Sequence, residues 1–168
     1  MKSQVWESLY KEIATRITDN IQSIQWVDLW HNQVGFLEEE HAFPTPAVFL
    51  SFRTTGVENQ GELVQNVDLQ IDLYYFYETF LDTYQGAHNE TDALEYLNVL
   101  TSFHQLFHGY TPEGFNEMWR ISFGAVDTGS AGNLYKVSFS CKFMDESAKR
   151  QFDQVSPSGI ETRDFIQP

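Results

Sequence analysis

Apolar side chains recur at spacings of four and three along the first 24 residues. The series is Val5, Leu9, Ile13, Ile17, Ile21 and Ile24. Residues at these spacings share one face of an α-helix. We therefore predict an amphipathic helix over residues 3–24, with Ser3 as its candidate N-cap.

Alternation of apolar and polar residues predicts strands further along the chain. We expect them over residues 25–31, 46–52, 66–77, 119–125 and 135–143. In residues 66–77 the alternation is the most regular, and the apolar partners should be buried. The polar partners should lie on an exposed face near basic side chains of the last two strands, which allows cross-strand ion pairs. These polar and basic residues are Asn66, Asp68, Gln70 and Asp72, and Arg120, Lys136 and Lys142.

A second helix is predicted from about Asn89, with acidic residues in its first turn and Gly109 just past its end. Both features suit the helix dipole and the usual C-terminal stop. At 100° per residue, one face carries Ala93, Tyr96, Leu97, Leu100, Phe103 and Phe107. This face should pack on the sheet.

These elements predict an α+β fold in the order α-β-β-β-α-β-β. Each strand has one apolar face and each helix one apolar stripe, so we expect an antiparallel sheet of four to five strands with both helices on one face. The domain should span residues 1–145, followed by a polar C-terminal tail over residues 146–168. The loop over residues 32–45 should be polar and exposed.

The composition supports a folded chain with an acidic surface. The 168 residues are 42% apolar and carry a net charge of −14, so we expect no tight nucleic-acid binding. That acidity serves either solubility or a surface that DNA passes without adhering. A single cysteine, Cys141, and the lack of a continuous apolar segment favour an unprocessed, soluble protein in a reducing cytoplasm.

Candidate catalytic chemistry is confined to two short motifs. Residues 125–131 resemble the Asp-Thr-Gly-Ser motif of aspartic proteases, in which two aspartates activate water. A single copy would require a homodimer, and the alternative is a hairpin turn containing Asp127. His104 and His108 have zincin spacing, but Gln105 stands where the catalytic Glu is required. We therefore expect that the protein is not an enzyme and that it binds no cofactor or metal. We also expect Cys141 to be buried.

The element order and the proline-flanked strand Phe43-Pro-Thr-Pro-Ala-Val-Phe-Leu-Ser-Phe52 resemble the tail-terminator proteins of tailed bacteriophages, also called tail-completion or head-tail joining proteins. The resemblance covers residues 3–145. It implies a structural virion protein that forms a ring, usually a hexamer, which caps the tail tube and presents a surface to the head connector. It implies the tube and neck proteins as partners, assembly in the bacterial cytoplasm and no membrane contact.

Assembly residues are expected in the acidic loop and the tail. The tail is either an arm that docks on a neighbour or a disordered end. The candidate interface residues are Glu38, Glu39, Glu40, Phe152, Ile160, Phe165 and Ile166. Three alternatives remain: another neck or tail-tube protein, a homodimeric aspartic protease using Asp127, and a small-ligand module with an aromatic pocket.

Overall fold

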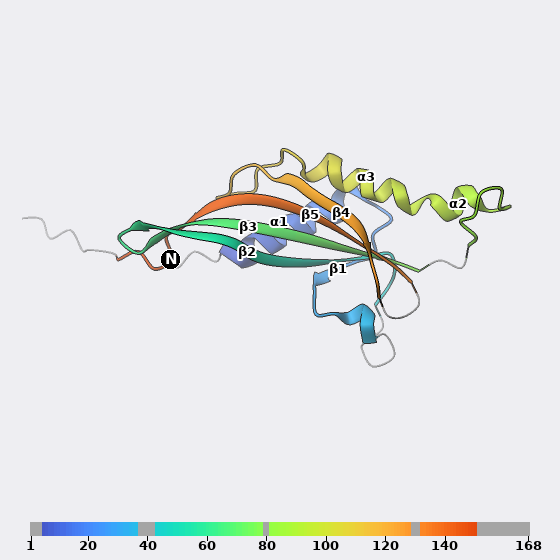
Figure 1. The fold of residues 1–168 in the computed structure, drawn as a ribbon, viewed down its shortest axis with the longest axis horizontal. Coiled ribbons are helices and arrows are strands. Elements are labelled where there is room, and N and C mark those ends of the chain that lie inside the picture. The colour runs from blue at the N-terminus through green and yellow to red at the C-terminus, as the bar shows by residue number, and fades with distance from the viewer. Residues whose placement is uncertain (1–4, 37–42, 79–80, 129–131, 151–168) are drawn as a thin grey trace, which may run out of the picture.

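The computed structural model describes residues 5–36, 43–78, 81–128 and 132–150. Its helices are α1 (Val5–Asn20), α2 (Glu90–Leu94) and α3 (Tyr96–Phe107), with a short 3-10 helix η1 (Gln33–Phe36). The strands are β1 (Trp26–Leu29), β2 (Ala47–Gly61), β3 (Val64–Tyr77), β4 (Trp119–Val126) and β5 (Asn133–Asp145). They form one sheet in the order β1-β2-β3-β5-β4 (Figure 1).

The predicted α+β class is confirmed, but the sheet is mixed rather than wholly antiparallel. β2, β3, β5 and β4 pair antiparallel to one another, whereas β1 pairs parallel to β2 through residues 26–29 and 47–50. A parallel pair needs a connection long enough to return the chain to the start of the first strand. Residues 30–46 provide that connection. The sequence prediction did not take its length into account and therefore expected β1 to be antiparallel to β2.

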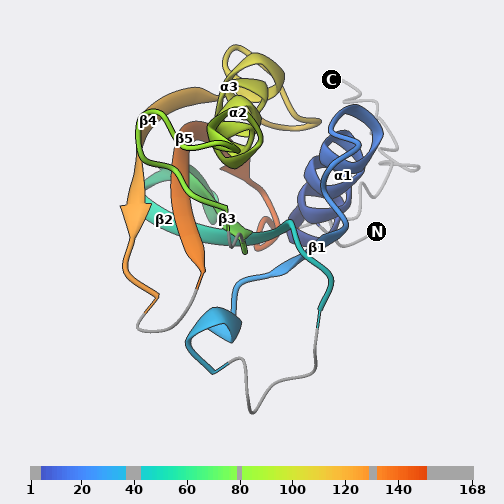
Figure 2. The ribbon, with the colours of Figure 1, turned by 90° about the vertical axis from the view of Figure 1, so that its right-hand side faces the viewer.

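Both long helices pack on the same face of the sheet, as predicted (Figure 2). The helix-side core joins α1 through Leu9, Ile13 and Ile17 to α3 through Phe103 and Phe107. Its sheet contribution comes from alternate residues of β3 and β5. These are Val67, Leu69, Ile71, Leu73 and Tyr75, and Val137, Phe139, Cys141 and Phe143. Burying each of the larger side chains contributes about 1.5–3 kcal/mol, so this core is the main source of stability.

The second predicted helix is interrupted. α2 ends at Leu94 and α3 begins at Tyr96, with Glu95 between them in a turn. Glu95 keeps helical backbone angles, φ −57° and ψ −31°, and Ala93 before it is buried like Phe103 after it. Leu97, predicted to face the core, is 40% exposed, and Val99 is buried instead. The remaining predicted positions of this face, including Ala93, Phe103 and Phe107, are in the protein interior.

A smaller core lies on the opposite face of the sheet, beneath the β1–β2 connection. It contains Val34, Ala47, Phe49, Phe76 and Leu134. The ring of Trp30 stacks on that of Tyr74 at 4.1 Å between centroids. The expectation that residues 32–45 are an exposed polar loop is therefore wrong for Gln33 and Val34, because this face of the sheet also has apolar side chains to cover.

The polar side of β3 also differs from the prediction. Gln70 and Asp72 are buried rather than exposed, since β3 is the central strand and its neighbours cover both. Asp72 accepts hydrogen bonds from Ser138 at 2.5 Å and from the Gln70 amide at 2.8 Å. Asp68 remains partly exposed and pairs with Lys142 at 2.8 Å, as the sequence predicted. Buried polar groups of this kind require such partners.

The predicted strand over residues 46–52 continues to Gly61 and forms a long hairpin with β3. The turn places Gly61, Glu62 and Leu63 at φ values of 89°, 51° and 64°. Gly61 pairs with Val64, so Glu62 and Leu63 form a two-residue turn, and the positive φ of both is what a tight hairpin turn requires. The hairpin extends beyond the short strand β1, which pairs only with residues 47–50 of β2.

Candidate assembly surface

The residues that the sequence proposed for assembly lie outside the described part of the chain. They are Glu38, Glu39, Glu40, Phe152, Ile160, Phe165 and Ile166. Whether they form an interface stays a prediction. The described residues point instead to a surface that the sequence analysis missed, at the edge of the sheet.

Strand β4 is the edge strand of the sheet and exposes large apolar side chains. Trp119, Ile121 and Phe123 are 53%, 54% and 57% exposed. Among the described residues, no further strand pairs with the outer side of β4. An exposed apolar edge strand is a ready template for pairing with another chain, and monomeric proteins usually protect such edges.

A β-bulge changes which way the side chains of β4 face. The pairing with β5 shifts between Arg120 and Ser122, so Ile121 has no direct partner. Residues opposite each other in a ladder lie on the same face. Phe123 is opposite the core residue Val137 and lies on the helix side, whereas Trp119 is opposite Ser140. The predicted single apolar face of this strand is therefore wrong, because the bulge reverses the alternation.

The start of β4 is anchored by α3. The backbone N–H of Arg120 donates a hydrogen bond to Nδ1 of His108 at 3.1 Å, and the Trp119 ring makes an edge contact with His108 at 5.0 Å. The guanidinium of Arg120 lies 5.2 Å from the centroid of the Phe123 ring. Beside Trp119, a pocket of about 500 Å³ is lined in part by Phe115, Lys142 and Ser140. The exposed side chains thus sit on a well-supported strand.

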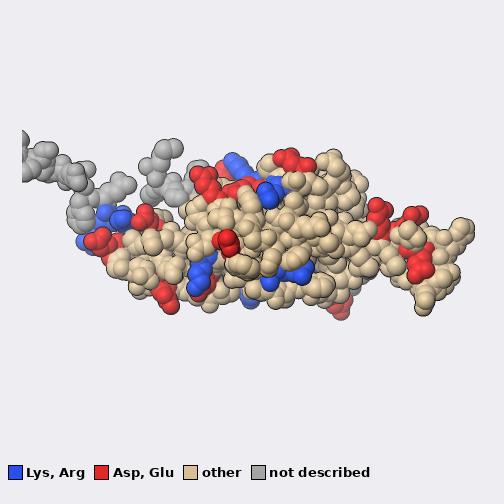
Figure 3. Space-filling model, turned by 90° about the horizontal axis from the view of Figure 1, so that it is seen from above, with Lys and Arg blue, Asp and Glu red and all other residues tan. Residues whose placement is uncertain are grey.

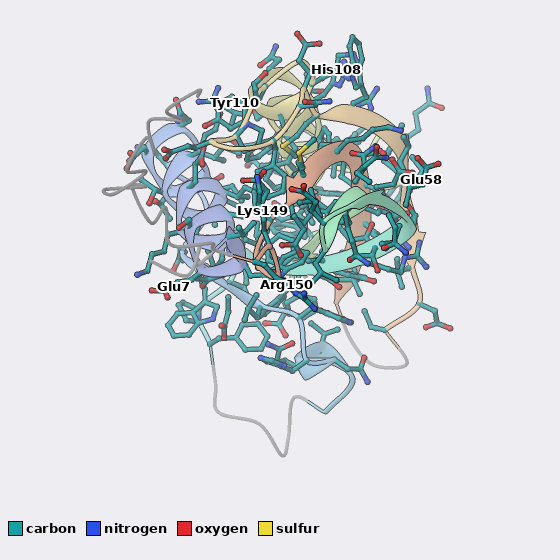
Figure 4. The ribbon with its side chains drawn as sticks, turned by 90° about the vertical axis from the view of Figure 1, so that its left-hand side faces the viewer. Glu7, Glu58, His108, Tyr110, Lys149 and Arg150 are labelled. Carbon is teal, nitrogen blue, oxygen red and sulfur yellow. The ribbon has the colours of Figure 1, made fainter. Side chains whose placement is uncertain are left out.

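A second unpaired edge lies on the opposite side of the sheet. Beyond Leu50, residues 51–61 of β2 have β3 on one side and no described strand on the other. Val57 in this segment is 50% exposed, and it is opposite the core residue Val67. Figure 4 shows Glu58 on the outer rim of this hairpin, across the molecule from Glu7 of α1. Among the described residues, both ends of the sheet therefore have an unpaired edge.

Charge is unevenly spread over the chain. Residues 119–126 contain one charged side chain, Arg120, in a protein of net charge −14. Acidic side chains gather near α2, at one end of the molecule (Figure 3), where Glu90 and Asp92 occupy the first turn. The β4 edge is therefore a region where a second acidic molecule can approach with little repulsion.

The two histidines of α3 lie side by side, and one of them is bonded to the backbone of β4. The rings of His104 and His108 lie 4.5 Å apart, and Nδ1 of His108 accepts the Arg120 N–H. Burial, Arg120 and His108 lower the pKa of His104. Within the described ranges, no group of three or more His, Cys, Asp and Glu residues could hold a metal ion.

The structure also locates Asp127 and Cys141, the other two residues considered for chemistry. Asp127 directly follows β4 in the connection to β5, so the predicted hairpin is confirmed, and its side chain is exposed. Cys141 is 3% exposed in the helix-side core, as predicted, and burial raises the pKa of its thiol to about 11. In the part of the chain that the structure describes, no helix has the length and apolarity to cross a membrane.

A tyrosine-lined pocket of about 510 Å³ lies between the end of α1 and α3. Tyr75, Tyr77 and Tyr96 contribute to it, and the rings of Tyr77 and Tyr96 stack at 5.2 Å. A hydrogen bond with the Tyr135 hydroxyl, together with burial, raises the pKa of Tyr96 to about 12, and burial also raises the pKa of Tyr75. The pocket therefore offers neutral hydroxyl groups and aromatic rings.

Comparison with models of known protein families and with curated proteins returned no match.

Proposed function

We propose that this chain is a non-catalytic structural protein that assembles with copies of itself, and that it is the tail terminator of a tailed bacteriophage. In this role it forms a ring, most simply a hexamer, that caps the tail tube and joins it to the head or neck. Its partners are further copies, the tube protein and the connector or neck proteins, and its location is the virion. The observation that carries this proposal is the exposed apolar edge strand β4.

The two free sheet edges support self-assembly. An isolated subunit exposes Trp119, Ile121 and Phe123 to water, which disfavours the monomer at working concentrations. A contact between two different surfaces of the same chain repeats from copy to copy, and it closes into a ring when the rotation permits. The free edges of β4 and of β2 are two different surfaces of this kind.

The family resemblance supplies the specific role. The order of elements agrees with the predicted layout, and the proline-flanked stretch that ends at Phe52 forms the first part of β2. The candidate docking arm at residues 146–168 and the acidic loop at Glu38 to Glu40 remain part of the proposal. Each would supply further contacts to neighbouring copies or to the tube.

The charge distribution indicates which surface of the ring would repel DNA. The open sheet face carries Arg53, Lys136 and Lys142 against Asp68 and Asp72, so its charges nearly balance. The carboxylates lie mainly elsewhere, including the end of the molecule that bears α2 (Figure 3). We therefore place the DNA-repelling surface of the ring at the acidic α2 end rather than on the open sheet face.

Electron microscopy of the purified protein tests the proposal. We expect closed rings of uniform size, and we expect tail tubes incubated with these rings to stop growing at a capped end. The matched control is Phe123→Asp, which should give folded protein without rings. A wild-type protein that stays monomeric at all concentrations would contradict the proposal. Long tubes in place of single rings would identify the tube protein instead.

The tyrosine-lined pocket favours a second function, binding of a small ligand, which predicts saturable thermal stabilisation by that ligand. A concave site with aromatic side chains and a few polar groups is typical of small-ligand sites. The aspartic protease alternative needs two Asp127 side chains brought together by a dimer. Loss of a peptidase activity in Asp127→Asn would support it.

A further inference from the structure

We infer that the outer edge of β4 beyond Arg120, whose backbone N–H already donates to His108, pairs with residues 51–61 of β2 in the next copy, so that one sheet continues from subunit to subunit. This inference rests on the proposed self-assembly. It identifies the two surfaces through which neighbouring copies make contact. The occupant of the β4 edge is a second copy of this chain. Both surfaces lie wholly within the described residues.

Strand directions fit this contact. β1, β2 and β5 run in one direction, and β3 and β4 run in the opposite direction. Copies placed side by side with the same orientation therefore bring β4 of one against β2 of the next as an antiparallel pair. Antiparallel pairing is the arrangement of all other long strands in this sheet, and its hydrogen bonds lie perpendicular to the strands.

The side chains at the two edges are compatible. Phe123 and Val57 both lie on the helix side, because their ladder partners Val137 and Val67 belong to the helix-side core. When the helix sides of two copies are continuous, these exposed apolar side chains can cover each other. Arg120 is the one charged residue of β4, and the β2 segment adds one Arg and one Glu, Arg53 and Glu58. The contact thus avoids the acidic repulsion that a chain of net charge −14 would create elsewhere.

The positions of the two edges along the strand direction are also compatible with ring closure. Through the ladder registers, β4 stands level with residues 47–53 of β2, the inner half of the hairpin. β1 already occupies residues 47–50, so the free segment lies further out along the strand. Each new copy is then displaced along the strands relative to the last. Such a stagger, with tilted strands, is what closing a sheet on itself requires.

Two other pairings are disfavoured. The outer side of β1 lies against α1, whose Tyr10 hydroxyl donates a hydrogen bond to the Val27 carbonyl at 3.4 Å. A symmetric contact between two β4 strands would leave the free edge of β2 unpaired in both copies. It would also end at a dimer, since neither copy would retain an open β4.

Cysteine cross-linking distinguishes these arrangements. The double variant Val57→Cys with Phe123→Cys is compared with each single variant and with the wild type, using a short bismaleimide and denaturing gels. Cys141 is buried and should not react, which the wild type checks directly. Both mutated positions are exposed, so the double variant should fold, and native mass is measured for every variant before cross-linking. A folded double variant that no longer assembles while the wild type does would support the contact, because the substitutions remove the two side chains placed there.

We expect a ladder of dimers, trimers and higher species from the double variant and no cross-linked product from either single variant. Dimers from Phe123→Cys alone would overturn the inference in favour of a symmetric β4 contact. Rings in native mass without any cross-linked product would also overturn it, while leaving the proposed self-assembly intact. A double variant and wild type that are both monomeric would overturn self-assembly and the inference together.

Discussion

Strands β3 and β4 have similar apolar alternation in the sequence and opposite fates in the structure. Leu69, Ile71 and Leu73 of β3 are completely buried, whereas Ile121 and Phe123 of β4 are more than half exposed. β3 has a strand on each side and helices over one face, while β4 has a neighbour on one side. An alternating pattern therefore predicts a strand, but its place in the sheet decides which apolar side chains remain for other molecules.

Leu69→Asp should have the largest effect because it breaks the central strand. An unpaired carboxylate in this core costs several kcal/mol, which is comparable with the whole stability of a domain of this size. We expect insoluble or unfolded protein by circular dichroism. Phe123→Asp makes the same kind of change on the edge strand and should leave a cooperative melting transition. A variant at Leu69 that melts near the wild-type temperature would show that the face of β3 is wrongly assigned.

Asp72→Ala should come next, with a loss of about 1–3 kcal/mol in the free energy of unfolding. The substitution leaves the buried Ser138 hydroxyl and the Gln70 amide without their acceptor. Denaturant titration measures the loss. Asp68→Ala, which removes only the exposed partner of Lys142, should cost less. Equal losses in the two variants would contradict the burial difference along β3.

Cys141 should make stability fall at alkaline pH. Burial raises the thiol pKa from its ordinary value to about 11, so the unfolded chain loses this proton at lower pH than the folded chain. The stabilisation is present below pH 9 and is lost as pH rises toward 11, by about 2 kcal/mol at most. Urea titrations across this range should show a steeper loss for the wild type than for Cys141→Ala. Parallel curves would mean that the thiol is accessible.

Asp127→Ala should have the smallest effect, at most about 1 kcal/mol, because the side chain is exposed at the end of the edge strand. Thermal melting measures the change, and ring formation should be unaltered. An accompanying loss of peptide cleavage would instead place Asp127 in an active site.

Much of the fold was predictable from local patterns. The spacing of Leu9, Ile13 and Ile17 gave the first helix, and the alternation around Leu69 and Phe139 gave the two central strands and their core-facing sides. These features succeed because one apolar face of each element must be buried against another. The same logic placed both helices on one side of the sheet.

The errors arise where long-range contacts override local pattern. Nothing near Asp72 in sequence reveals Ser138, which is 66 residues away and makes burial of the carboxylate tolerable. The bulge at Ile121 depends on the pairing with β5. The exposure of Leu97 depends on how α3 packs on the sheet, which decides whether a side chain at the border of its apolar face is covered. The direction of β1 likewise depends on its pairing with β2, a contact that local pattern does not reveal.

The candidate surface could not be read from the pattern for the same reason. Apolar residues in a predicted strand are assigned to the core by default, and only the strand order shows that β4 is an edge. One sequence signal was available: residues 119–126 contain no acidic side chain in a strongly acidic chain. The loop and tail residues proposed in its place lie outside the described residues and keep the status of predictions.

The central claim is that the β4 edge drives self-assembly, and native mass spectrometry over a range of protein concentrations tests it most directly. Wild type, Phe123→Asp and Leu97→Asp are compared, the last being a matched change at an exposed apolar position on a helix rather than on an edge strand. We expect a discrete closed oligomer for wild type and Leu97→Asp, and folded monomer for Phe123→Asp. An oligomer of unchanged size and stability in Phe123→Asp would contradict the claim.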